Sequence, residues 1–379
     1  MLFMPIIVPF YMENGLGMKE IMLLQGVYSI TIVILEIPSG YFSDVLGRRK
    51  TLVIGSVLGF FGFLTYSLSF GFWGFLIAEI ILGLGQSLIS GTDSAMLYDT
   101  LIDTKKEKEY LKYEGRIISI GNFAEAIAGT LGGLLAGLSL RLPYFFQTGV
   151  ALMAIPASFL LIEPIRKLSQ KKMNFKDILK IVKYSLHDHK ALQKNIFFSA
   201  LIGTATLTMA WFVQPIFLIN NIPIEGFGLL WTLLNLTVGL IAAIAYKIEQ
   251  RLKQKFSIII IALSIPILYV LVSQSGLYSS IALLFVFYSI RGFATPVLKD
   301  YINRLVPSDI RATILSVRNF IIRLNFVIIG PFLGWYSDFY SLKQALFLAG
   351  VIFLVLSMLT MILFIASMKK PQRVDIKFD

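Results

Sequence analysis

Four charged side chains fall in the middle of long apolar stretches of the sequence. They are Asp93 and Glu125 in the first half of the chain, and Arg291 and Arg323 in the second. A charge in hydrocarbon costs roughly 2.5–3.5 kcal/mol on insertion scales, so such residues indicate a functional site. Removal from water favours the neutral form of a carboxyl group, whereas a nearby arginine favours the ionised form, so Asp93 or Glu125 could take up and release a proton. A static buried ion pair that orients helices is the alternative.

The elements that must position these residues are membrane-spanning helices. Apolar residues make up 56% of the 379 residues and charged residues 15%, and the mean hydropathy is +0.77, which leaves too little polar surface for a soluble protein. A hydrocarbon core of roughly 30 Å requires about 20 apolar residues per helix. Eleven such runs lie near 20–42, 51–69, 72–99, 115–138, 142–163, 195–219, 227–246, 256–274, 278–302, 312–335 and 343–366. Residues 1–12 are apolar over half a span, and we interpret them as the second half of a truncated first helix, which makes twelve.

The positions of the basic residues predict the orientation of these helices. Alternate connecting segments and the C-terminal tail hold 28 of the 34 lysines and arginines, whereas the connections on the opposite side hold only Lys19, Arg141 and Lys343. Under the positive-inside rule, we expect a multi-pass protein of the cytoplasmic membrane with both termini in the cytoplasm. The net charge of +12 is therefore explained by topology, and we expect no nucleic-acid partner.

The longest connection predicts the domain organisation. Segment 164–194 follows the sixth span and divides the chain into an N-terminal six-helix bundle, 1–163, and a C-terminal one, 195–379. Apolar residues recur in this segment at helical spacing among lysines, so it could form an amphipathic helix on the inner membrane surface; a solvated linker is the alternative.

An internal repeat supports the division into two bundles. Ile118-Ser119-x-x-Asn122-Phe123 recurs as Leu315-Ser316-x-x-Asn319-Phe320, and Asp99 matches Asp300 further upstream. Repeated six-helix halves are typical of transporters whose two bundles rock about a central site.

The connection between the second and third spans carries a motif. It reads Gly40-Tyr41-Phe42-Ser43-Asp44-Val45-Leu46-Gly47-Arg48-Arg49-Lys50. This resembles the major facilitator superfamily signature G-x-x-x-D-x-x-G-R-[KR] at every fixed position, and the resemblance in helix count and central loop covers the whole chain. It implies an all-α fold of two pseudo-symmetric six-helix bundles. It also implies that Gly40 and Gly47 permit close packing and a tight turn, while Asp44, Arg48 and Arg49 form a charge latch between the halves. The second copy of the motif is eroded, because Lys247, Glu249, Arg251 and Lys255 keep charge without the glycines.

The resemblance also assigns places to other charged residues. In this family helices 1, 4, 7 and 10 line the central cavity, which would let Asp93 and Arg291 face the pathway. Glu36 and Arg318 would lie where the halves meet, as a gate pair; snorkelling to the interface is the alternative. Glu79 lies in a region where drug–proton antiporters of the family usually carry arginine. This difference argues against proton coupling by the same pattern as in those antiporters.

The resemblance predicts secondary transport of a small molecule by alternating access. The antiporter signature G-P-x-x-G-G is half present around Gly129 and Gly133, which favours proton-coupled export of an amphipathic compound. Uptake of a small nutrient such as a sugar or metabolite, and a passive channel or scramblase, are the alternatives.

We find no nucleotide-binding or hydrolase motif, and His187 and His189 have no ligand partners nearby in sequence. We therefore expect a monomer in the lipid bilayer that is not an enzyme and has no cofactor and no metal.

Overall fold

The computed structural model describes residues 1–106, 109–164, 180–306 and 310–368, and these parts are helical with no strand. Within α-helices, the side chains of residues 36–41, 44, 110–112, 114–115, 118–119 and 312 are outside this description. In the described ranges nine helices are long and apolar enough to cross a membrane. Large apolar side chains on them, such as Trp73 and Tyr278, remain exposed, as expected of helices whose solvent is lipid.

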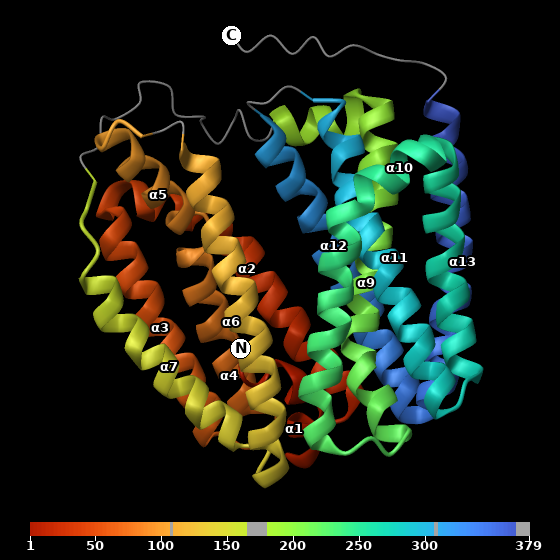
Figure 1. Cartoon of the computed structure of the whole chain (residues 1–379), viewed down its shortest axis with the longest axis horizontal. Helices are drawn as coiled ribbons and strands as arrows, with labels where there is room; N and C mark the ends of the chain where they lie inside the picture. The colour runs from red at the N-terminus through yellow and green to blue at the C-terminus, as the bar shows by residue number, and fades with distance from the viewer. Residues whose placement is uncertain (107–108, 165–179, 307–309, 369–379) are drawn as a thin grey trace. The chain divides into compact units, whose positions relative to one another are not determined.

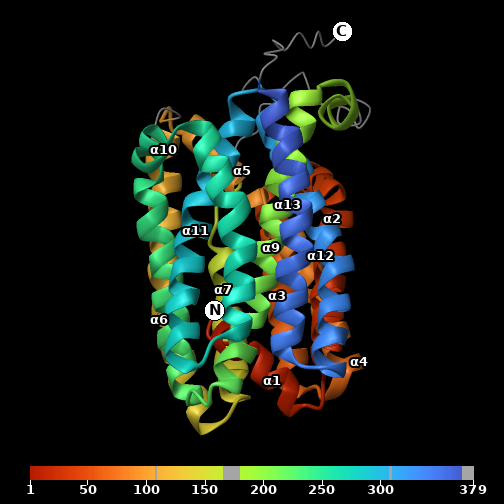
Figure 2. The ribbon, with the colours of Figure 1, turned by 90° about the vertical axis from the view of Figure 1, so that its right-hand side faces the viewer.

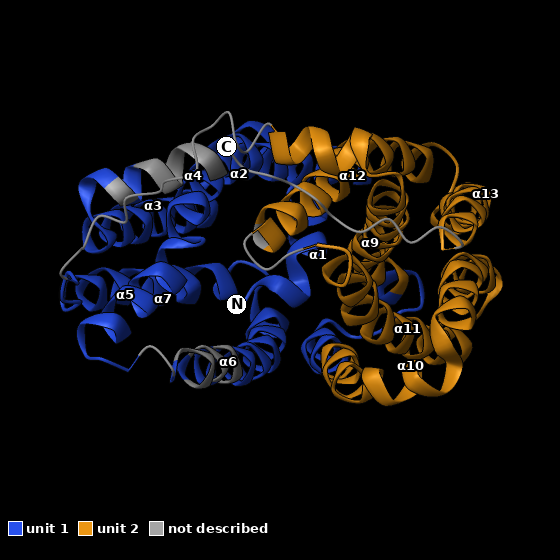
Figure 3. Cartoon of the chain, turned by 90° about the horizontal axis from the view of Figure 1, so that it is seen from above, with its two compact units in different colours: residues 1–169, 217–232 blue, residues 170–216, 233–379 orange. Residues whose placement is uncertain are grey.

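The chain divides into two compact units, which Figure 3 shows in two colours. Unit 1 comprises residues 1–169 and 217–232, and unit 2 comprises residues 170–216 and 233–379.

Unit 1 begins with two short helical segments and continues through longer helices (Figure 1). They are η1 (Met4–Ile6), α1 (Ile7–Glu13), α2 (Met18–Leu46), α3 (Arg48–Leu68), α4 (Gly71–Ile89), α5 (Thr92–Asp103), α6 (Tyr110–Leu138) and α7 (Leu142–Phe159). We call the two ends of this helix set the Gly47 end, where α3 begins and α5 and α7 finish, and the Arg141 end, where α2, α4 and α7 begin.

One predicted span is broken. The run 72–99 forms α4 and α5, separated at Ser90 and Gly91, and Gly91 adopts a φ of +79° that glycine tolerates best. The sequence showed one continuous apolar stretch because hydropathy does not register a local change in backbone conformation.

Unit 2 contains a short π-helical turn, η3 (Tyr184–Asp188), and long helices (Figure 2). They are α9 (Lys190–Ile219) and α10 (Ile224–Gln274), whose residues 217–232 belong to unit 1, followed by α11 (Leu277–Asn303), α12 (Arg311–Phe339) and α13 (Leu342–Ser367). The 51 residues of α10 include Lys253 in a non-helical conformation, with φ 63° and ψ 157°. The predicted spans 227–246 and 256–274 are therefore two helical stretches joined through this break.

The predicted all-α membrane fold is confirmed. Nine helices of the described residues are candidate spans, and one of them, α10, carries two predicted spans, which makes ten. Helix α6 corresponds to a further predicted span, and η1 with α1 forms the short first one, which gives the predicted twelve. The predicted amphipathic helix of 164–194 falls largely on residues 165–179, which lie outside the described residues. The division at this segment into bundles 1–163 and 195–379 stays a prediction.

Each unit has its own apolar core. In unit 1, aromatic rings from different helices pack together: Phe10 and Tyr144 have ring centroids 4.1 Å apart, and Tyr66 stacks on both Phe75 and Tyr144. In unit 2, aliphatic side chains of α9, α11 and α12 form a buried cluster that includes Ile196, Ile302, Ile314 and Ile321. The aromatic core of unit 1 surrounds polar groups described below.

Candidate functional site

The turn between α2 and α3 is built around Gly47. Its φ of +110° lies in a region that residues with a Cβ rarely adopt, and a Cβ at this position would lie 3.0 Å from a carboxylate oxygen of Glu163. Glycine therefore lets α3 start immediately after α2 ends and lets a carboxylate approach the turn.

Arg48, the first residue of α3, connects this turn to α5. Its Nε lies 3.2 Å from Oδ2 of Asp99, and its Nη1 donates to Oγ of Ser43 at 2.8 Å. The Arg48 and Asp99 side chains are 16% and 27% exposed. Partial removal from water makes this charge-assisted hydrogen bond stronger than a pair on an open surface.

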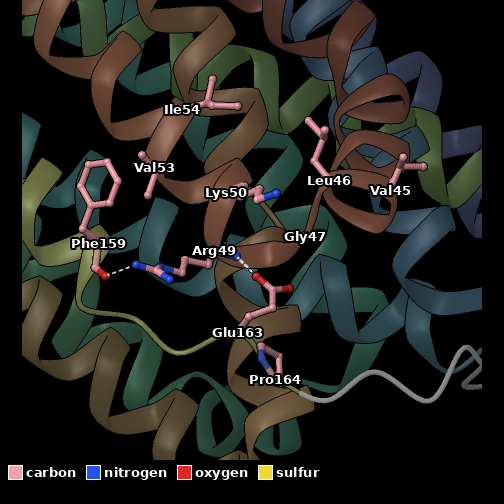
Figure 4. Close-up of a pocket in the computed structure, with 10 residues that line it drawn as sticks. All are labelled: Val45, Leu46, Gly47, Arg49, Lys50, Val53, Ile54, Phe159, Glu163 and Pro164. Atoms are coloured by element: carbon pink, nitrogen blue, oxygen red, sulfur yellow. Dashed lines mark hydrogen bonds between the residues drawn. The ribbon is translucent and has the colours of Figure 1, made fainter.

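Glu163 binds the N-terminus of α3 (Figure 4). Its Oε1 accepts from the backbone N–H of Arg48 and its Oε2 from that of Arg49, both at 2.8 Å. Figure 4 draws the bond from Arg49. These N–H groups have no partner inside the helix, and the helix dipole is positive here, so a carboxylate is favoured. Arg49 in turn donates through Nη2 to the backbone oxygen of Phe159 at 2.6 Å. The end of α7 and its following residues are thus attached to the start of α3.

A cavity of about 780 Å³ lies beside this turn. Figure 4 shows its lining: Val45, Leu46, Gly47, Arg49, Lys50, Val53, Ile54, Phe159, Glu163 and Pro164. Most of these side chains are apolar; the charged ones are two basic residues of the first turn of α3, Arg49 and Lys50, and one acidic residue that follows α7, Glu163. Any change that separates α3 from the end of α7 would change this cavity.

Unit 2 has a weaker arrangement at the repeat partner of Asp99. Asp300 pairs with Arg304 of its own chain segment at 2.5 Å, and Arg304 lies 3.9 Å from Oε2 of Glu249. Tyr301 also donates to Glu249, at 3.1 Å. Glu249 belongs to the eroded second motif, so charge pairing persists there without the glycine turn.

The predicted pathway residues of unit 1 are both exposed. Asp93 lies in the first turn of α5, just after the break at Gly91, and its Oδ1 accepts from the backbone N–H of Ser94 at 2.7 Å. Glu125 lies on α6. Both carboxylates are therefore open to whatever fills the space beside α5 and α6.

The predicted pathway residues of unit 2 are both half-buried. Arg291 on α11 has its guanidinium carbon 5.4 Å from the ring centroid of Tyr288, within cation–π range. Arg323 lies on α12. A common site of these residues with Asp93 and Glu125 stays a prediction.

Only some of the predicted gate and latch side chains lie within the described part of the chain. The side chains of Glu36 and Asp44 lie outside the described residues, and Gly40 is known only as part of α2. Arg318 on α12 is buried, and it donates through Nε to Oγ of Ser199 on α9 at 2.5 Å and through Nη1 to Oδ1 of its neighbour Asn319 at 3.0 Å. Arg318 therefore connects two helices of unit 2.

Buried Glu79 forms a second polar centre in unit 1, 3% exposed on α4. Its Oε1 accepts from the hydroxyl of Tyr11 at 2.9 Å and from Nε2 of Gln25 at a shorter distance. The hydroxyl of Tyr11 also bonds to that of Tyr66. A carboxyl group thus lies where α1, α2, α3 and α4 meet.

Sequence reasoning missed the roles of three of these acidic residues. In the sequence, Asp99 stands out only as the repeat partner of Asp300, and Glu163 is only the last residue of the run 142–163. Glu79 was noticed but remained ambiguous, because its partners come from three other helices.

A glycine-rich face of α6 packs against the start of α10 inside unit 1. A Cβ on Gly133 would lie 2.7 Å from the backbone N of Gly228, and a Cβ on Gly228 would lie 2.4 Å from the backbone oxygen of Gly129. Thr232 adds a hydrogen bond to the backbone oxygen of Ala126 at 3.3 Å. The half-preserved antiporter signature is therefore a surface of close backbone contact.

The glycine turn, its basic residues and the helix content match a known family. The model of the Major Facilitator Superfamily matches residues 1–328. The chain belongs to this superfamily. The predicted family membership is thus confirmed, and this major facilitator is an integral, multi-pass membrane protein.

Two relatives from Bacillus subtilis (strain 168) are similar to this major facilitator. The uncharacterized MFS-type transporter YxaM is 21% identical over 368 residues, which cover 94% of this chain and 90% of that protein. Multidrug resistance protein 2 is 29% identical over 173 residues, 43% of this chain and 41% of that protein.

Among solved structures, a mutant of the nucleoside transporter NupG resembles this major facilitator with a TM-score of 0.82. It is 13% identical in sequence, with 96% of this chain and 95% of that chain covered. At this identity the likeness shows the fold.

Proposed function

We propose that this major facilitator is a secondary transporter that exports an amphipathic organic compound in exchange for protons. The observation that carries the direction and the substrate class is the 29% identity to a multidrug resistance protein over 173 residues. The glycine contact between α6 and α10, at the half-preserved antiporter signature, supports the same assignment.

The orientation follows from the basic residues. With 28 of the 34 lysines and arginines in one set of connections and the C-terminal tail, we assign the Gly47 end and the C-terminal tail to the cytoplasm. In this orientation the cavity of Figure 4 lies at the cytoplasmic end of unit 1.

The network at the Gly47 end supports a role as a conformational latch. The first turn of α3 is attached to α5 by Arg48 and Asp99 and to the residues after α7 by Glu163. Residues held by several partners move as one piece, so the α2–α3 turn offers a preformed surface that the other bundle can engage or release. Gly40, Asp44, Gly47, Arg48 and Arg49 would make this surface, with Glu36 and Arg318 as the gate.

The central pathway remains as proposed from the sequence. Asp93 and Glu125, both exposed in unit 1, would face a water-filled cavity together with half-buried Arg291 and Arg323. Charged residues in such a cavity avoid the cost of hydrocarbon and remain available to a substrate.

The test is flux into proteoliposomes that contain the purified protein, with ethidium as the probe because its charge does not change with pH. An acidic interior should drive saturable ethidium accumulation, and collapse of the pH gradient by nigericin should abolish it. Protein-free liposomes provide the control. Uptake driven by an acidic exterior would indicate a symporter instead, and a flux that does not saturate would indicate a channel.

A further inference from the structure

The chemistry around Glu79 is unusual for a buried carboxyl group. Among the described residues, Glu79 forms no ion pair, and its hydrogen-bond donors are neutral groups that include the hydroxyl of Tyr11 and the amide of Gln25. A second hydroxyl, that of Tyr66, bonds to Tyr11. An ionised carboxylate without a cation is costly in a low-dielectric interior, so the neutral form is within reach.

The neutral partners can satisfy both forms of the carboxyl group. A tyrosine hydroxyl donates or accepts a hydrogen bond, and a glutamine amide has both a donor and an acceptor end, whereas arginine and lysine only donate. Tyr11, Tyr66 and Gln25 can therefore donate to a carboxylate, or rotate and accept from a carboxylic acid. The pair of Arg48 and Asp99 lacks this freedom.

Among the described residues, no charged side chain of α1, α2, α3 or α5 bonds to Glu79: Glu20 accepts from the backbone N–H of Gly17, Asp99 pairs with Arg48, and Asp93 is exposed. At the start of α7 the ionisable groups are Tyr144 and Arg141, the residue at its N-cap. Arg141 donates to the backbone oxygens of Ser67 and Ser69 and to Asn14.

Tyr144 extends the polar centre toward the Arg141 end. Its ring stacks on that of Tyr66 with centroids 5.4 Å apart, and its buried hydroxyl has no hydrogen-bond partner among the described residues. Glu79 is eight residues into α4 from Gly71, about 12 Å along the helix at 1.5 Å per residue. The carboxyl group is thus closer to the Arg141 end than to the Gly47 end.

We propose that Glu79 is the binding site of the coupling proton, held in both protonation states by Tyr11, Tyr66 and Gln25. The proposal rests on the proposed proton-coupled function. A proton from water at the Arg141 end binds the Glu79 carboxylate, which becomes a neutral carboxylic acid. The same O–H bond breaks when the proton leaves to water at the opposite side in the other conformation, which restores the carboxylate, so one proton crosses per cycle.

The first experiment compares wild-type protein with Glu79→Gln in the ethidium assay and by infrared difference spectroscopy between acidic and alkaline pH. The variant should lose its stimulation by an acidic interior, so that the flux with and without the gradient becomes equal within about twofold. A protonated-carboxyl band present in the wild type should disappear. A variant that keeps the stimulation, or a band that persists, would overturn the proposal.

The infrared measurement distinguishes failure of this proposal from failure of the proposed function. If the wild type shows no stimulation by the pH gradient, proton-coupled export fails, while the presence or absence of the Glu79 band still decides whether this carboxyl group binds a proton.

A second variant covers the case in which Glu79→Gln does not fold. Tyr66→Phe removes one hydroxyl from the network that donates to the carboxylate, so the protonated form should persist to a pH about one unit higher. Tyr269→Phe is the matched control, because it deletes a buried hydroxyl whose hydrogen bonds are to backbone groups, among them the oxygen of Ala205 at 2.6 Å. A titration unchanged by Tyr66→Phe, or shifted equally by Tyr269→Phe, would contradict the proposal.

Discussion

The Nε of Arg48 lies 3.2 Å from Oδ2 of Asp99, a residue 51 positions further along the chain. This contact joins the first residue of α3 to α5, and so fixes the turn at Gly47 with respect to α5. The superfamily motif supplies Arg48, but its partner Asp99 comes from outside the motif.

Arg48→Gln should weaken the attachment of α3 to α5. The pair is partly buried, so we expect a loss of about 1–2 kcal/mol in the free energy of unfolding, together with slower transport. Thermal unfolding in detergent and the ethidium assay measure the two effects. In a double-mutant cycle, Arg48→Gln with Asp99→Asn should lose less than the sum of the two single changes; strictly additive losses would show that the two residues are not coupled.

Glu163→Ala should leave the N-terminus of α3 without its acceptor. Loss of a capping group costs about 1 kcal/mol, and loss of the negative charge near the helix dipole adds to it. Glu163→Gln keeps an acceptor oxygen and loses the charge, so its stability should lie between those of Glu163→Ala and the wild type. Equal stability of all three proteins would refute the capping role.

Gly228→Ala should disrupt the close contact between α6 and α10. The added Cβ would meet the backbone oxygen of Gly129 at 2.4 Å, so the helices must separate, at a cost of about 1–3 kcal/mol. Gly239→Ala on the same helix is the matched control, because nothing lies within 4 Å of its added Cβ. This control should be neutral or stabilising by up to about 1 kcal/mol through helix propensity. Similar effects of both changes on thermal unfolding would disprove the packing argument.

Arg141→Lys should destabilise the Arg141 end of unit 1 although the charge is kept. The guanidinium donates to Ser67 and Ser69 backbone oxygens at 2.9 Å and to Asn14 at 2.7 Å, and lies 4.0 Å from the ring centroid of Phe70. A lysine cannot reproduce this fork, so we expect a loss of about 2 kcal/mol. Burial lowers the pKa of Arg141, opposed by the charge of Glu13, yet an arginine stays charged at neutral pH. Unchanged thermal unfolding of Arg141→Lys would contradict this role.

The sequence was sufficient for features that depend on local composition. Runs of about 20 apolar residues located the helices, and the glycine pattern in residues 40–50 pointed to the family. Hydropathy could not reveal the break at Gly91, nor that Lys253 joins two spans within α10, because both depend on backbone angles.

The partners of the charged residues could not be predicted, because they depend on how helices distant in sequence are rotated against one another. Asp99 and Glu163 meet the α2–α3 turn only after α5 and α7 pack beside α3. Glu79 becomes a buried polar centre only because Tyr11, Gln25 and Tyr66 come from three other helices. A single charged residue in an apolar stretch indicates a free-energy cost of burying the charge. The structure is needed to identify the partner groups that offset this cost.

Alternating access is tested most directly by two distances measured by pulsed electron paramagnetic resonance. The sequence contains no cysteine, so spin labels can be placed without a background. One protein carries Lys50→Cys and Lys255→Cys, at the end that we assign to the cytoplasm, and another carries Ser139→Cys and Ser279→Cys, at the opposite end. When pH and ethidium concentration are varied, one distance should lengthen while the other shortens. Two distances that stay constant, or that lengthen together, would contradict a carrier that opens to one side at a time.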